Sequence, residues 1–321
     1  MMKFYLVGAK LKPKILNNWE LYDKAIVLEL ELANHKHKIN KAVEYNSPPA
    51  VCPDNNASIS FTAATLSNQK LFVGTHTEVL VYNEKNFKIE NYISLPMFND
   101  IHHVKPRTNG NILVVNTGLD MVIELSPKGK VINCWNVLGN QPWERFNNSI
   151  DYRKVPSTKP HESHPNFAFE INGDIWVTRC LQKDAVCLTD SNKKISIGRE
   201  WIHDGIVYNN KIYFTQIDGR VVIVNANTLK VEKEIDLVKI SNHNMKIGYC
   251  RGIRPLNEEK ILVGFSRVRP SREFKPDGTI TWKGQYGHMP TRLACFDIVN
   301  QKLLWEINLE DYDLNAIYSI N

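Results

Sequence analysis

Apolar and polar residues group into short segments along the chain, and one arrangement of these segments returns about every 40 residues. Each copy contains an apolar segment, a polar turn, a β-branched strand and two further strands separated by turns. The clearest copy has predicted strands at 98–104, 112–116, 121–125 and 131–137. Four such strands make one blade of a β-propeller. Helical periodicity of useful length is nearly absent, which argues against an α/β fold.

The same template fits four more stretches, at 58–95, 164–201, 203–237 and 250–309. The two ends of the chain supply a sixth unit. Residues 314–318 form a first strand with no second strand after it, and residues 4–9 form a second strand with no first strand before it.

Joining the two ends completes a blade, with its third and fourth strands at 25–32 and 36–45, and removes the exposed edges of an open ring. We therefore predict an all-β, six-bladed β-propeller with four-stranded blades, its first blade closed by the C-terminal strand, as a single domain over residues 1–321. A seven-bladed ring and a β-sandwich are the alternatives.

Composition narrows the class of protein. Apolar residues make up 43% and charged residues 23% of the chain, as in globular proteins with a sizeable core. The net charge of +6 comes without any run of like charges, so we expect anionic small molecules rather than nucleic acid as partners. No stretch approaches the roughly 18 apolar residues of a membrane span, and the apolar run at the N-terminus is short for a signal peptide. A cytoplasmic location is the expectation.

Four connections between the predicted strands are long, namely 10–24, 46–57, 138–163 and 267–290. In a propeller all four emerge on the same face. Loops of this length are uncommon in compact domains unless they form lids or binding walls, so this face is the predicted functional face. A contact between subunits is the alternative.

Polar side chains precede the apolar anchor of the first strand in five of the six predicted blades. Because these strands line the channel, the side chains are expected to converge on its mouth. The polar residues at the strand starts, the strand ends and the insertions that we single out are Asn99, His102, His103, His164, Asn166, Arg179, His203, Asp204, Gln216, His243, Arg251, Arg267 and Asn315.

Two kinds of chemistry can use this set. Neutral imidazoles of His164, His203 and His243, with His102 or His103 as alternatives to His243, would bind a divalent ion of zinc, iron or calcium. Alternatively, His203 or His164 would act as general base or nucleophile with a carboxylate such as Asp204 as its orienting partner.

In that second scheme His102 and His103 are further catalytic candidates, and Arg251 and Arg179 would hold an anionic group by paired hydrogen bonds. The amides Asn99, Asn166, Asn315 and Gln216, together with Arg267, are the remaining predicted substrate contacts. The structural alternative is that each His only caps a strand start.

The stretch Asn99-Asp100-Ile101-His102-His103-Val104, followed by Asn109-Gly110-Asn111-Ile112-Leu113-Val114 and Val122-Ile123-Glu124-Leu125-Ser126, resembles the blades of arylsulfotransferase-like and related propeller proteins. In arylsulfotransferases a histidine accepts the sulfuryl group and basic residues hold it. The resemblance implies His102, His103, His164 or His203 for that role. Propeller lyases and hydrolases with a metal bound by histidines of several blades are an equally good comparison.

The sequence thus predicts an enzyme that acts on a small polar or anionic molecule at the channel mouth, a lyase or hydrolase dependent on histidine or metal. Sulfotransferase-like group transfer and a non-catalytic propeller that binds a ligand or a protein are the alternatives.

Overall fold

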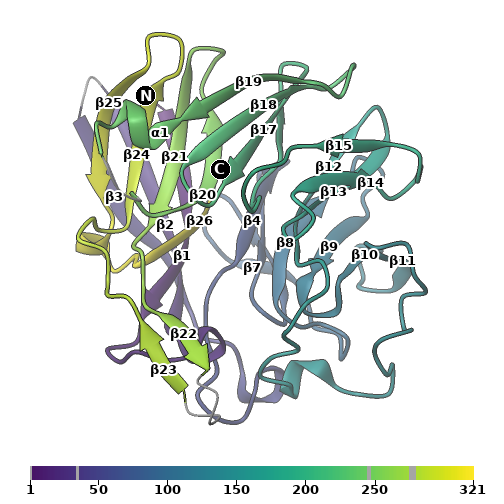
Figure 1. Cartoon of the computed structure of the whole chain (residues 1–321). Helices are drawn as coiled ribbons and strands as arrows, with labels where there is room; N and C mark the ends of the chain where they lie inside the picture. The colour runs from purple at the N-terminus through teal and green to yellow at the C-terminus, as the bar shows by residue number, and fades with distance from the viewer. Residues whose placement is uncertain (1, 34–35, 244–246, 275–279) are drawn as a thin grey trace.

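A computed structural model describes residues 2–33, 36–243, 247–274 and 280–321. Within them the chain forms six four-stranded antiparallel sheets and one two-stranded hairpin (Figure 1). The prediction of a six-bladed β-propeller is confirmed. No helix of the described residues has the length and apolar character needed to cross a membrane.

The first three blades have the following strands. Blade 1 contains β26 (Ala316–Ile320), β1 (Met2–Leu11), β2 (Tyr22–Ala33) and β3 (Lys36–Tyr45). Blade 2 contains β4 (Ala63–Ser67), β5 (Lys70–Gly74), β6 (Val79–Asn83) and β7 (Ile89–Ile93). Blade 3 contains β8 (Ile101–Pro106), β9 (Ile112–Asn116), β10 (Met121–Leu125) and β11 (Val131–Asn136).

The other three blades follow the same order. Blade 4 contains β12 (Pro165–Ile171), β13 (Asp174–Arg179), β14 (Asp184–Cys187) and β15 (Lys194–Ser196). Blade 5 contains β16 (Ile206–Tyr208), β17 (Lys211–Gln216), β18 (Arg220–Asn225) and β19 (Val231–Asp236). Blade 6 contains β20 (Tyr249–Pro255), β21 (Lys260–Ser266), β24 (Arg292–Asp297) and β25 (Lys302–Asn308).

Helical structure is short. The chain has one helical turn, α1 (Leu237–Ile240), and the 3-10 turns η1 (Asn18–Glu20), η2 (Pro49–Val51), η3 (Thr117–Leu119), η4 (Tyr152–Lys154) and η5 (Glu310–Tyr312) among its described residues.

Burial differs between the middle and the outer strands of a blade. The middle strand β9 is buried along its whole length because both of its faces pack on neighbouring blades, and its sequence is correspondingly apolar, Ile-Leu-Val-Val-Asn. The outer strand β19 is mostly exposed and carries Glu232, Lys233 and Glu234. Charged residues on such an edge discourage pairing with another chain.

The ring is closed by the two ends of the chain, as predicted. β26 pairs with β1 in the register Leu6↔Ile320 and Ala9↔Ala316. Gly8 makes the close approach possible, since a Cβ at this position would lie 1.8 Å from the carbonyl oxygen of Ala316. The first strands of neighbouring blades contact one another all the way around the channel, in the order β26, β4, β8, β12, β16, β20.

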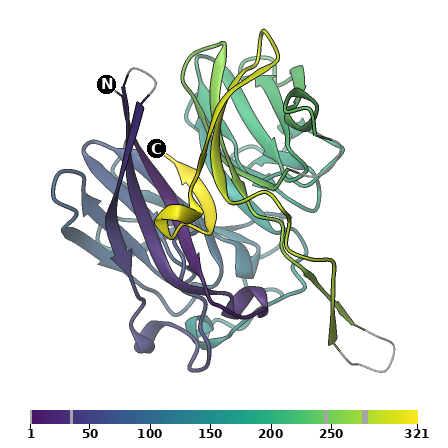
Figure 2. The ribbon, with the colours of Figure 1, turned by 90° about the vertical axis from the view of Figure 1, so that its left-hand side faces the viewer.

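The four long connections lie on one face, at the lower end of the molecule in Figures 1 and 2. The connection between β21 and β24 contains a hairpin that the sequence pattern did not predict, β22 (Ser271–Phe274) and β23 (Ile280–Lys283), which projects from the body in Figure 2. Residues 275–279 of this predicted insertion lie outside the described residues.

Long side chains join the insertions to one another. Lys12 donates to the carbonyl oxygen of Ala57 at 2.9 Å, and Lys154 donates to that of Cys52 at 3.0 Å. Arg269 donates to the Tyr22 hydroxyl at 2.7 Å. The insertions therefore form a connected rim around the end of the channel.

Candidate functional site

A cavity of about 110 Å³, here called the axial cavity, opens inside this rim. Every insertion contributes to its lining, through Asn18, Pro53, His161 and Arg269 respectively. The floor comes from residues at or before the first strands of several blades, namely Thr62, Asp100, His102, His164, Arg251 and Tyr318. Residues far apart in sequence thus meet at one end of the channel.

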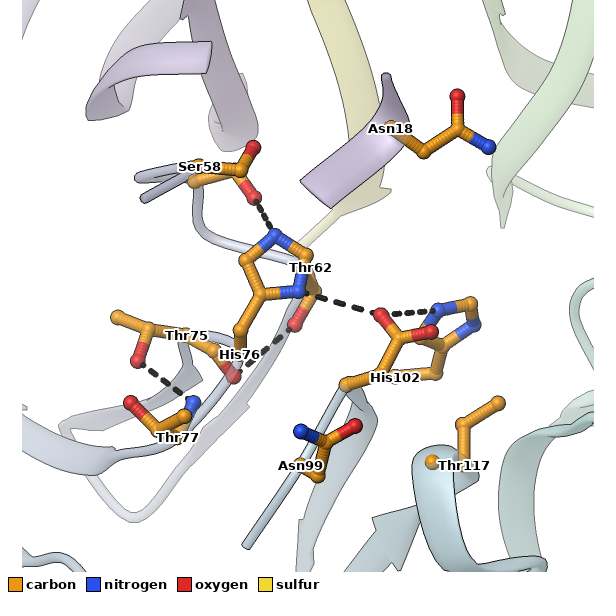
Figure 3. A network of polar contacts seen from close by, with 12 residues as sticks. Asn18, Ser58, Thr62, Thr75, His76, Thr77, Asn99, His102 and Thr117 are labelled. Atoms are coloured by element: carbon orange, nitrogen blue, oxygen red, sulfur yellow. Dashed lines mark hydrogen bonds and ion pairs between the residues drawn. The ribbon is translucent and has the colours of Figure 1, made fainter. Parts of the chain in front are cut away.

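The imidazoles of His76 and His102, which both line the axial cavity, lie near each other (Figure 3), and the Asp100 carboxylate contacts both of them. Its Oδ1 is 3.1 Å from Nδ1 of His76 and 3.3 Å from Nε2 of His102. Burial by itself would raise the pKa of Asp100, but the adjacent His102 and the hydrogen bonds from both imidazoles outweigh burial and hold this pKa well below its usual range. Asp100 is therefore a carboxylate.

Both ring nitrogens of His102 face hydrogen-bond acceptors. The Asn166 side chain donates through Nδ2 to the carbonyl oxygen of Ile202 at 2.7 Å, so its Oδ1 is the atom 2.6 Å from His102 Nδ1. The other nitrogen of His102 faces the Asp100 carboxylate. His102 can donate to both acceptors at once only when both of its ring nitrogens carry a proton.

His161 and His164 form a second, neutral pair. Their Nδ1 atoms are 2.7 Å apart, which requires one to donate and the other to accept. Burial lowers the pKa of His161 to about 4. Burial, followed by the electrostatic effect of His102, holds the pKa of His164 well below its usual range. The ring centroids of His102 and His164 are 4.8 Å apart.

The direction of the hydrogen bonds in this pair follows from Thr158. Its hydroxyl donates to the carbonyl oxygen of Gly118 at 2.5 Å, so its Oγ1 is left to accept from His161 Nε2 at 3.4 Å. His161 with a proton on Nε2 has a bare Nδ1, which accepts from Nδ1 of His164. Nε2 of His164 then carries a free lone pair.

Asp120 holds the backbone of this histidine pair, and it was not among the residues singled out from the sequence. Its buried carboxylate accepts from the backbone N–H groups of Ser163 at 3.1 Å and His164 at 2.8 Å through Oδ1. Its Oδ2 accepts from the N–H of Glu162 at 2.9 Å and from Arg145 at 2.8 Å. These bonds maintain His164 in the left-handed backbone region, at φ +57°, which a non-glycine residue seldom adopts.

Two arginines, Arg251 and Arg269, also line the axial cavity, and neither has a carboxylate partner among the described residues. The guanidinium of Arg251 lies 5.2 Å from the ring centroid of Tyr318 and 5.7 Å from that of Tyr249, and its Nε is buried without a hydrogen bond. Arg269 lies 5.8 Å from the Tyr249 ring and donates to the Tyr22 hydroxyl. Arg269 also donates to the side-chain oxygen of Asn18 at 2.9 Å. All of these partners are neutral, so no carboxylate among the described residues balances the two charges.

A second cavity of about 240 Å³, here called the side cavity, shares Tyr22, Arg251 and Arg269 with the axial cavity. Its other lining residues include Tyr249, Arg267, Tyr286 and Asn315. Arg267 forms a paired salt bridge with Glu310 at 2.8 and 2.5 Å, so its charge is balanced. Asn315 Oδ1 accepts from the backbone N–H of Leu11 at 3.0 Å.

Several residues predicted to bind substrate have structural partners. Asn99 lines the axial cavity, but its Nδ2 donates to the carbonyl oxygens of Tyr152 and Val155 at 2.8 Å. Arg179 forms a paired salt bridge with Asp184 at 2.8 and 2.7 Å and lines neither cavity. Gln216 Nε2 donates to the carbonyl oxygen of Gly198 at 2.6 Å, away from both cavities.

His103 lies toward the other end of the channel, in a separate cavity with Lys105 and Phe169. Its Nδ1 accepts from the backbone N–H of Ala168 at 3.2 Å, and its ring stacks on Phe167 at a centroid distance of 3.6 Å. Burial holds its pKa well below the usual range. Through these contacts the His103 side chain packs between the inner strands β8 and β12.

Asp204 lines the cavity that contains His103, and its neighbour His203 lines none of the three cavities. His203 Nδ1 is 3.3 Å from Asp204 Oδ1, and burial lowers the pKa of His203. The ring centroids of His203 and His102 are 6.1 Å apart. Asp204 Oδ2 accepts from the Gly252 N–H at 2.9 Å and from the Thr215 hydroxyl at 2.5 Å, so this carboxylate also ties blades 5 and 6 together.

The predicted metal ligands are His164, His203 and His243. His243 follows α1 and lines neither cavity. Across the described ranges, no group of three or more His, Cys, Asp or Glu side chains has an arrangement suited to a metal ion. The metal site stays a prediction from the sequence.

Comparison with known proteins supports the fold class. No family model and no curated protein matches the sequence. The structure is similar to that of a protein of unknown function from Bacteroides caccae, with a TM-score of 0.59 and 11% identity over 99% of this chain and 97% of that chain. A streptogramin B lyase structure gives a TM-score of 0.51 and 14% identity over 81% of this chain and 86% of that chain. Likeness at these identities concerns the fold alone, and the class of protein is the six-bladed β-propeller.

Proposed function

We propose that this propeller is an enzyme that binds a small anionic molecule in the axial cavity and uses His164 as general base in a lyase or hydrolase step. The observation that carries the proposal is the pair Arg251 and Arg269, whose charges are held by tyrosines rather than by carboxylates. Cations without a partner inside a concave site attract an anion, and a guanidinium matches a carboxylate or phosphate group.

The neutral His164 supports the catalytic part of the proposal. Its Nε2 lone pair can accept a proton from the substrate or from a water molecule, while Nδ1 keeps its hydrogen bond to His161. A bound anion also favours the protonated imidazole, so occupation of the arginine pair raises the basicity of His164. Burial, and after it the electrostatic effect of His102, lowers the pKa of His164 and keeps this base neutral.

Binding is tested by calorimetric titration with inorganic phosphate. We expect Arg251→Gln and Arg269→Gln each to weaken binding by about 10-fold to 100-fold, the value of one charge-assisted hydrogen bond. Arg254→Gln is the matched control. Arg254 lies three residues after Arg251 in β20, is exposed, and lines only the separate cavity that contains His103. Phosphate binding that is the same in all four proteins would contradict the anion site.

Catalysis is tested with a panel of small carboxylates and phosphate esters, followed by proton NMR for product formation. His164→Ala is expected to slow turnover by at least about 100-fold, whereas the exposed His37→Ala leaves it unchanged. Turnover that survives His164→Ala would contradict the assignment of the base.

Group transfer is a second candidate, favoured by the same Nε2 lone pair and by the arylsulfotransferase-like blade motif. A histidine nucleophile would take a sulfuryl group from an aryl sulfate, releasing the phenol, and would carry it as a covalent adduct. Intact mass measurement after incubation with an aryl sulfate separates the two candidates. An adduct that is absent in His164→Ala supports group transfer, and an unmodified protein supports general-base chemistry.

A further inference from the structure

We infer that the molecule recognised here has two parts, an anionic group that pairs with Arg251 and Arg269 and an aromatic ring that occupies the side cavity. This inference rests on the proposed anion site and names the substrate class for it. Its starting observation is that both arginines line both cavities, so a ligand held by them has access to the two spaces at once.

The side cavity has the size and the walls for a ring. Its volume of about 240 Å³ exceeds the roughly 150 Å³ apolar cavity that is known to hold benzene. Tyr22, Tyr249 and Tyr286 contribute three aromatic side chains to its lining, with Leu11 beside them. Aromatic walls bind a planar ring through stacked or edge contacts.

The side cavity offers no further unpaired arginine that would bind a second anionic group. Its third arginine, Arg267, is already paired with Glu310 through two hydrogen bonds. Asn315 is engaged by the backbone of Leu11. Among the arginines of the side cavity, the two without a carboxylate partner in the described residues are therefore the ones that it shares with the axial cavity. This places the anionic group at one end of the ligand and the ring beyond it.

Tyr286 is the residue that tests this division. It lines the side cavity and not the axial cavity. Burial raises the pKa of Tyr286, and the charge of Arg269 opposes this rise. The Tyr249 ring makes cation–π contacts with the guanidinium groups of both arginines, so its removal would disturb them. Removal of the Tyr286 side chain should leave the arginine pair in place. Trp282 provides the matched control, as an exposed aromatic residue of the same insertion that lines neither cavity.

The experiment compares inorganic phosphate with phenyl phosphate by calorimetry on the full chain. We expect phenyl phosphate to bind at least about tenfold more tightly to the wild type, because its ring leaves water for the side cavity. Tyr286→Ala should remove most of this advantage without changing phosphate binding, and Trp282→Ala should keep it.

Phosphate binding that depends on the arginines, together with no advantage for phenyl phosphate, overturns the two-part ligand and leaves the anion site intact. An advantage that survives Tyr286→Ala overturns it as well. Loss of binding for both probes overturns the anion site itself, so the two failures are distinguishable.

Discussion

Replacement of His161 by glutamine should make the protein less sensitive to acid. The folded protein holds the pKa of His161 at about 4, whereas the ordinary value of 6.5 applies to the unfolded chain. Below pH 6.5 the unfolded chain therefore takes up a proton that the folded protein rejects. The stability contributed by neutral His161 is complete above this pH and is lost as the pH falls toward 4.

The size of the effect follows from the two pKa values. Each pH unit inside the window costs about 1.4 kcal/mol, so the wild type should lose about 2 kcal/mol between pH 7.5 and pH 5 through this residue. His161→Gln lacks this contribution. The difference is measured by urea unfolding of both proteins at the two pH values, with tryptophan fluorescence as the signal.

The control is His37→Gln, a substitution at an exposed histidine of β3 that should follow the wild type. Equal loss of stability in the wild type and in His161→Gln would contradict the lowered pKa of His161 in the folded protein. In that case His161 is not held neutral, and the direction of the hydrogen bonds that leaves Nε2 of His164 free would be wrong.

Two further substitutions test a loop of the site and the closure of the ring. Asp120→Asn removes an acceptor from the backbone N–H groups of residues 162–164. Amide hydrogen exchange of these residues should become at least about tenfold faster, while exchange in β9 keeps its rate. Unchanged exchange at residues 162–164 would contradict the role of Asp120 in holding this backbone. Gly8→Ala places a Cβ against the carbonyl oxygen of Ala316. It should lower the free energy of unfolding, measured by urea titration, by about 3 kcal/mol. An unchanged midpoint of the unfolding transition would contradict the pairing of β26 with β1.

The fold could be predicted because its physical determinants are local and repeated. Each blade needs apolar strands such as β9 that pack on both sides, and turns at regular intervals, so the pattern appears once for every blade. The closure of the ring was predictable for a related reason, since each end of the chain lacked the strand that the other end had. The hairpin of β22 and β23 was missed because it occurs only once and has no copy in the other blades.

The site was predicted only in outline. His102, His164 and Arg251 were expected at the channel mouth because they precede or begin first strands, and the structure places them around the axial cavity. Arg269 was missed because it lies in an insertion, where the position of a residue in the sequence does not indicate which way its side chain points. Asp120 was missed because it lies in a turn, where an aspartate is an ordinary residue.

Arg179 shows the converse problem. A strand end indicates that a side chain is near the channel, but it does not reveal that Asp184 lies on the adjacent strand and neutralises it. The metal ion, the cytoplasmic location and the single domain stay predictions.

The most direct test of the anion site is a crystal structure of the protein with inorganic phosphate. We expect a phosphate in the axial cavity, with its oxygens within hydrogen-bond distance of the Arg251 and Arg269 guanidinium groups. An axial cavity that holds only water at saturating phosphate, with both arginines still against their tyrosines, would contradict it.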